Sequence, residues 1–109
     1  MARSGAATVT NVVVTAGKPS EFKFTLSTST VKRGAIVFKV TNHGSVPHDF
    51  KVCSAPGNLD AYSCDGSGTA VLGPETTLTI TFTSPGTYEY LCTIAGHAEA
   101  GMKGTLVVK

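Results

Sequence analysis

Apolar and polar residues alternate along much of this chain, which is the pattern expected of half-buried β-strands. Ile36, Phe38 and Val40 share one face of such a run, and Leu78, Ile80 and Phe82 alternate with threonines in another. The runs that predict strands lie at residues 9–15, 22–26, 36–41, 48–52, 69–72, 78–82, 88–92 and 106–108.

Turn-forming residues separate these runs, at 17–19, 32–34, 73–74 and 84–86. About eight short strands with turns between them are typical of a β-sandwich. We therefore predict an all-β fold, an antiparallel Greek-key β-sandwich of about eight strands. At 109 residues the chain is expected to form a single domain, residues 1–109.

Composition excludes some classes of partner. The formal net charge is only +2, and no cluster of Lys and Arg forms a stripe, so a nucleic-acid partner is not expected. No apolar run is long enough to span a bilayer. Few charged residues and many β-branched ones agree with a β-rich fold.

The candidate chemistry lies on a segment near the C-terminus. Cys92, His97 and Met102 follow one another at Cys-x4-His-x4-Met spacing, and a second imidazole, His48, stands upstream after Pro47. Two imidazoles, one thiolate and a distant thioether are the ligands of a blue-copper electron-transfer site. We therefore predict that these four side chains bind one copper ion.

Strand parity supports this interpretation. His48 shares a face with Phe50 and Val52, and Cys92 shares one with Tyr88 and Tyr90, so both ligands are expected to point inward. Strand ends gather at one pole of a sandwich, where His48 would begin a strand, Cys92 would end one and Met102 would precede the last.

Each residue also has a plainer interpretation. Cys92 could be a buried structural cysteine and Met102 could fill a gap in the core. His48 could be a core histidine with satisfied hydrogen bonds, and His97 an ordinary surface histidine. His43 lies in an Asn-His-Gly turn, so we expect it to be exposed and do not propose it as a ligand.

These motifs resemble those of the small cupredoxins, the family of plastocyanin, azurin and auracyanin. The resemblance is carried by residues 42–50, by residues 86–92, and by the following segment through Met102 and 104–108. It implies that the ring edge of His97 reaches the surface and passes the electron. It also implies that redox partner proteins dock on an apolar surface around this ring, made by Val46, Ala95, Gly96, Ala98 and Ala100.

Asp49 departs from the family pattern, which commonly has Asn directly after this histidine. The Asn side chain ties the two ligand loops together. An ionised Asp can accept hydrogen bonds but cannot donate them, and its charge favours Cu(II) modestly. Asn42 and Thr93 are further candidates for supporting the ligands.

The other two cysteines, Cys53 and Cys64, form an even pair when Cys92 is a ligand. This count permits one disulfide and leaves two free thiols as the alternative. A disulfide agrees with an oxidising compartment, so we predict a periplasmic or extracellular protein. Residues Met1 to Gly5 are not a signal peptide, so a signal or anchor segment is expected to be absent from this sequence.

The predicted function is one-electron transfer by a monomer that is not an enzyme. Two alternatives remain open. A copper carrier or storage protein would use the same ligand types but would need an exchangeable site. A domain of a larger copper oxidase or nitrite reductase would need further histidines, and only His43 is spare.

Overall fold

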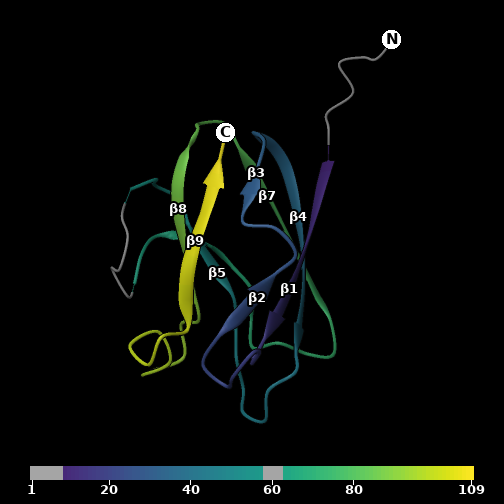
Figure 1. Cartoon of the computed structure of the whole chain (residues 1–109), viewed down its shortest axis with the longest axis vertical. Coiled ribbons are helices and arrows are strands. Elements are labelled where there is room, and N and C mark those ends of the chain that lie inside the picture. The colour runs from purple at the N-terminus through teal and green to yellow at the C-terminus, as the bar shows by residue number, and fades with distance from the viewer. Residues whose placement is uncertain (1–8, 58–62) are drawn as a thin grey trace.

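The computed structural model describes residues 9–57 and 63–109, which contain nine strands in two sheets (Figure 1). The predicted β-sandwich is therefore confirmed. The strands are β1 (Val9–Ala16), β2 (Phe24–Leu26), β3 (Thr30–Val31), β4 (Gly34–Asn42), β5 (Lys51–Cys53), β6 (Gly66–Gly68), β7 (Thr76–Phe82), β8 (Gly86–Leu91) and β9 (Lys103–Val108).

The first sheet has the strand order β2-β1-β4-β7. Strands β1 and β4 are parallel, with Val12 opposite Phe38, and the other pairs are antiparallel. Val12, Val14, Ile36, Phe38 and Val40 are fully buried, because alternate residues of a strand point to the same face. The period-two pattern thus marks the face that packs on the core.

The second sheet has the order β3-β9-β8-β5-β6. Strand β9 lies between β3, to which it is parallel, and β8, to which it is antiparallel with Tyr88 opposite Leu106. Because β8 and β9 are consecutive neighbours, residues 92–102 form the connection at one end of this pair. Figure 1 shows this connection below β9 and near the turn that follows β4.

A cluster of aromatic side chains around Phe50 fills the core between the sheets, beneath the metal-ligand candidates. Phe50 contacts Phe24, Phe38 and Tyr90 with ring centroids 5.3–5.6 Å apart. Such contacts contribute beyond the apolar burial itself, which is worth about 1.5–3 kcal/mol for a fully buried side chain. Phe50 thereby fixes the chain two residues after His48.

Several details of the sequence-based prediction were wrong. The sheets are mixed rather than antiparallel, because β1 pairs with β4 and β3 with β9 in parallel. His48 does not begin a strand, since β5 begins only at Lys51. Residues 69–72 are not a strand; the strand in this part of the chain is β6, residues 66–68, which pairs with β5.

Within the described residues, no helix is long and apolar enough to cross a membrane.

Candidate metal centre

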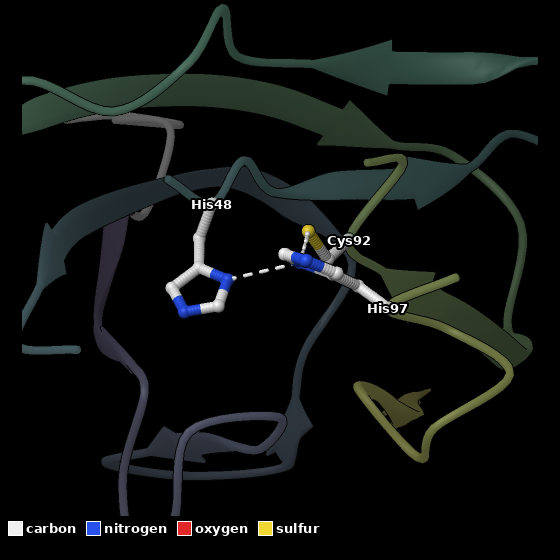
Figure 2. Close-up of side chains that lie close together, drawn as sticks. All are labelled: His48, Cys92 and His97. Atoms are coloured by element: carbon white, nitrogen blue, oxygen red, sulfur yellow. Dashed lines mark hydrogen bonds between the residues drawn. The ribbon is translucent and has the colours of Figure 1, made fainter. Parts of the chain in front are cut away.

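Three of the predicted ligands converge on one point (Figure 2). The Nδ1 atoms of His48 and His97 are 3.2 Å apart, and the Sγ atom of Cys92 is 3.5 Å from Nδ1 of His97. The donor atoms of all three residues lie within 4.8 Å of one another. His48 and Cys92 are fully buried, whereas His97 is half-buried.

This arrangement has the right dimensions for one metal ion. Bonds from a metal to His nitrogen and Cys sulfur are about 2.0–2.3 Å long, so donors that share an ion lie about 3–4 Å apart. Two imidazoles with a thiolate suit a copper ion chemically. His48, Cys92 and His97 could therefore hold one metal ion.

The loop that carries Cys92 and His97 is closed by its own backbone. The amide of Cys92 donates to the carbonyl of Met102 (3.1 Å), and the amide of Met102 donates to the carbonyl of His97 (3.0 Å). The amide of His97 donates in turn to Ile94 (3.0 Å). This network fixes the ring of His97 relative to Cys92 without help from a strand.

Met102 is fully buried and packs in one cluster with Cys92 and Ala16. Burial was expected whether the side chain is a ligand or a core residue. Its role as a weak ligand therefore stays a prediction, although the side chain lies next to the candidate thiolate.

A side-chain bond supports the turn before His48. The Asn42 side chain donates to the Val46 carbonyl (3.0 Å) and accepts from the Gly44 amide (2.8 Å). Beyond the turn, the carbonyl of His48 accepts from the Leu72 amide (2.9 Å). These bonds hold His48 in place although it lies outside β5.

The same turn packs backbone to backbone against the end of β1. A Cβ atom added to Gly17, which has a φ of +84°, would lie 2.5 Å from the Cα and N atoms of Gly44. The amide of His43 also donates to the carbonyl of Ala16 (2.9 Å). His43 itself is exposed, as predicted, and lies outside the cluster of donors.

Glu21 contacts His48, and sequence analysis did not find it. Its Oε2 atom is 2.5 Å from Nε2 of His48, while Oε1 accepts from the amide (2.8 Å) and the hydroxyl (2.7 Å) of Ser45. These bonds, first those from Ser45 and then that from His48, lower the pKa of Glu21 to about 2. No motif points to Glu21, because it lies on the loop before β2, far from His48 in sequence.

Asp49 links the segment of His48 to the loop that begins at Cys92, the role that the Asn side chain has in the family pattern. Its carboxylate accepts from the Thr93 amide (2.6 Å) and from the Thr93 hydroxyl. Both bonds use Asp49 as an acceptor only, in agreement with its expected chemistry. The expectation that Thr93 supports the site is also confirmed.

The Cys92 thiol lies in a mixed environment. Burial raises the pKa of Cys92, while hydrogen bonds from the backbone amides of Asp49 and Ile94 lower it without cancelling the effect of burial. These two amides are the hydrogen-bond donors to the Cys92 sulfur, which could not be identified from the sequence. A metal ion must displace the thiol proton to bind there.

The surface around His97 differs from the predicted one. Ala98 is only 2% exposed and packs with Cys53 and Leu91, so its place in the apolar surface was wrong. Phe22 takes that place instead: it is 37% exposed, and its ring centroid is 4.9 Å from that of His97. The remaining members of the predicted surface, Val46, Ala95, Gly96 and Ala100, are exposed.

Cys53 and Cys64 form the predicted disulfide, with their Cα atoms 5.5 Å apart. Both sulfur-bearing residues pack near Leu91 and Ala98. The disulfide therefore lies beside the start of the ligand loop, and Cys92 is the free cysteine of the described chain.

The fold and this cluster define a cupredoxin. Residues 10–109 match the family model of copper binding proteins of the plastocyanin/azurin family, and the chain belongs to this family. Copper is therefore the metal that the site is built for, and the similarity to cupredoxins stated from the motifs is confirmed.

Individual relatives differ in what their names record. The chain is 32% identical over 100 residues to the copper-resistant cuproprotein CopI of Rubrivivax gelatinosus, covering 80% of this chain and 60% of CopI. It is 40% identical over 95 residues to the minor isoform of chloroplastic plastocyanin from Arabidopsis thaliana, covering 84% and 49%. The chain thus spans about half to three-fifths of the length of these relatives.

Among solved structures, auracyanin A, a "blue" copper protein of Chloroflexus aurantiacus, superposes with a TM-score of 0.73. The two sequences are 20% identical, and the match covers 94% of this chain and 100% of auracyanin A. At this level of identity the likeness supports the fold alone.

Proposed function

We propose that this protein is a type 1 blue-copper electron carrier, in which His48, Cys92, His97 and Met102 bind one copper ion. The observation that carries the proposal is the convergence of two imidazole Nδ1 atoms and one buried sulfur on a single point. When bound, copper supplies the one-electron couple between Cu(I) and Cu(II).

The protein contributes a rigid and dry set of donors. Backbone bonds within the ligand loop fix His97, and the bonds from Thr93 to Asp49 hold that loop against the segment of His48. Burial of His48 and Cys92 keeps water away. A fixed donor set suits both oxidation states with little reorganisation during electron transfer.

His97 is the expected exit for the electron, because it is the most exposed of the proposed donors. We propose that redox partner proteins dock on an apolar surface of Phe22, Val46, Ala95 and Gly96 around this ring. Weak redox complexes need only small interfaces.

The protein is proposed to act as a single-domain monomer in the periplasm or outside the cell, where the disulfide is stable.

Copper(II) added to the copper-free protein should give an intense blue or green colour from charge transfer between thiolate and copper. The Cys92→Ser variant should lose this colour, because the hydroxyl is not a soft anionic donor. Circular dichroism checks that the variant stays folded. A coloured Ser variant would show that Cys92 is not the ligand.

A role in copper handling is the second candidate, because CopI, named for copper resistance, is among the relatives. A carrier must release its ion, whereas the buried positions of His48 and Cys92 favour retention. Transfer of Cu(I) to a competing chelator distinguishes the two roles. Loss of copper within seconds would favour a carrier, and retention over hours would favour electron transfer.

A further inference from the structure

The contact between Glu21 and His48 gives the proposed copper site a charged supporting group on the side away from the donors. We propose that Glu21 is a positioning residue for His48, which fixes the direction of its ring and lowers the reduction potential of the site. This inference rests on the proposed copper function and concerns how this chain controls its metal.

The carboxylate of Glu21 is held before it meets the histidine. Its Oε1 atom accepts from both the amide and the hydroxyl of Ser45, which leaves Oε2 directed at Nε2 of His48, 2.5 Å away. A histidine nitrogen that donates to a carboxylate carries the proton, and the other nitrogen is then free to bind a metal. The other nitrogen, Nδ1, is the one that faces His97.

The contact between Glu21 and His48 requires a residue without a side chain at position 44, in the turn before His48. A Cβ atom on Gly44 would collide with the Glu21 carboxylate and would lie 2.9 Å from Nε2 of His48. The His48 ring is fully buried, while the Glu21 side chain is 27% exposed. The hydrogen-bonded pair of Glu21 and His48 therefore closes the site at the point where the loop before β2 meets the turn before His48.

The charge of Glu21 has a predictable effect on the redox couple. A glutamate is ionised at neutral pH, and its negative charge, separated from the donors by one imidazole ring, stabilises the doubly charged ion more than the singly charged one. A carboxylate on the far nitrogen also makes the ligand nitrogen more basic, which favours Cu(II) further.

The experiment compares copper-loaded wild type with Glu21→Gln, Glu21→Ala and the control Glu75→Gln, which removes the same charge from an exposed position before β7. In redox titration, Glu21→Gln and Glu21→Ala should shift the equilibrium with a fixed mediator toward Cu(I) about tenfold, which is 59 mV for one electron. Glu75→Gln should shift it less than twofold.

Nuclear magnetic resonance of the Cu(I) form separates positioning from charge alone. In the wild type, long-range proton–nitrogen spectra should show a proton on Nε2 of His48 in slow exchange with water. In Glu21→Ala this proton should exchange rapidly, and in Glu21→Gln it should be partly protected because the amide oxygen still accepts a hydrogen bond.

Two kinds of failure can be told apart. Suppose that the wild type is blue, but that the reduction potential and the exchange of the His48 Nε2 proton are unchanged in both Glu21 variants. This result would overturn the role of Glu21 and leave the copper function standing. A wild type that gives no colour with copper would overturn the proposed function and this inference together.

Discussion

At the scale of single residues, Met102 is the proposed ligand whose contribution is weakest and most easily measured. Removal of its thioether in Met102→Leu should raise the reduction potential, because a donor to Cu(II) is lost. Met102→Gln should lower it, because an amide oxygen is a harder donor. Each change should be on the order of tenfold in the redox equilibrium, about 59 mV, measured by voltammetry.

Both Met102 variants should keep their copper, because His48, Cys92 and His97 remain. The conservative core change Leu106→Met is the matched control, since Leu106 is equally buried in β9 and is not a proposed ligand. Potentials that stay equal in both Met102 variants would make this residue a core side chain only.

Single residues also mark how far the sequence could predict the site. The types and spacing of His48, Cys92 and His97 identified them, and parity correctly indicated that His48 and Cys92 are buried. Ala98 was misplaced because it was assigned to the surface as a small, uncharged neighbour of His97, and residue type alone does not tell whether a side chain in a turn faces solvent or, as here, Cys53 and Leu91. Glu21 could not be found, because its contact with His48 depends on how two loops fold against each other.

At the scale of elements, the disulfide supports the segment that leads from β5 to β6. The double variant Cys53→Ala/Cys64→Ala should lower the free energy of unfolding by about 3 kcal/mol, because an open loop of this length has more freedom in the unfolded chain. Denaturant unfolding of the copper-free protein measures this difference.

The control for the disulfide variant is the wild type after reduction, which should lose a similar amount of stability. Ser54→Ala, a change next to Cys53 that keeps the bond, should lose much less. If the double variant were as stable as the oxidised wild type, the loop would already be ordered in the unfolded chain, contrary to the entropy argument.

The long strands were predictable from sequence, whereas the short strands β3 and β6 were not. Strands β4 and β7 have several alternating apolar positions, so their pattern is clear. Strand β6 is Gly-Ser-Gly and exposed, and it pairs with β5 through close backbone approach rather than apolar burial. Parallel pairing of β1 with β4 also leaves no local signal, because it joins residues far apart in the chain.

At the scale of the whole molecule, the apolar surface of Phe22, Val46, Ala95 and Gly96 is the place where electrons are expected to leave. Ala95→Asp should slow electron exchange with a redox partner protein several-fold, because a charge there must be partly desolvated on docking. Its visible spectrum should stay nearly unchanged. Stopped-flow oxidation of the reduced protein measures the rate.

The matched control is Ser29→Asp, an exposed position beside β3 at the opposite end of the sandwich from the ligand loop (Figure 1). At moderate salt a charge more than about 10 Å away is screened, so this variant should behave like the wild type. Equal rates for Ala95→Asp and wild type would move the exit away from His97.

The backbone contact between Gly17 and Gly44 makes the candidate metal centre sensitive to substitution at position 17, which supplies no metal donor. Any side chain at position 17 must displace the turn that carries Gly44, and that turn leads directly into His48. The φ of Gly17, +84°, adds a backbone penalty for any other residue at this position. A colony screen for loss of blue colour would therefore recover substitutions at the end of β1 together with those at the ligands, although inspection of the donor set alone would never select Gly17.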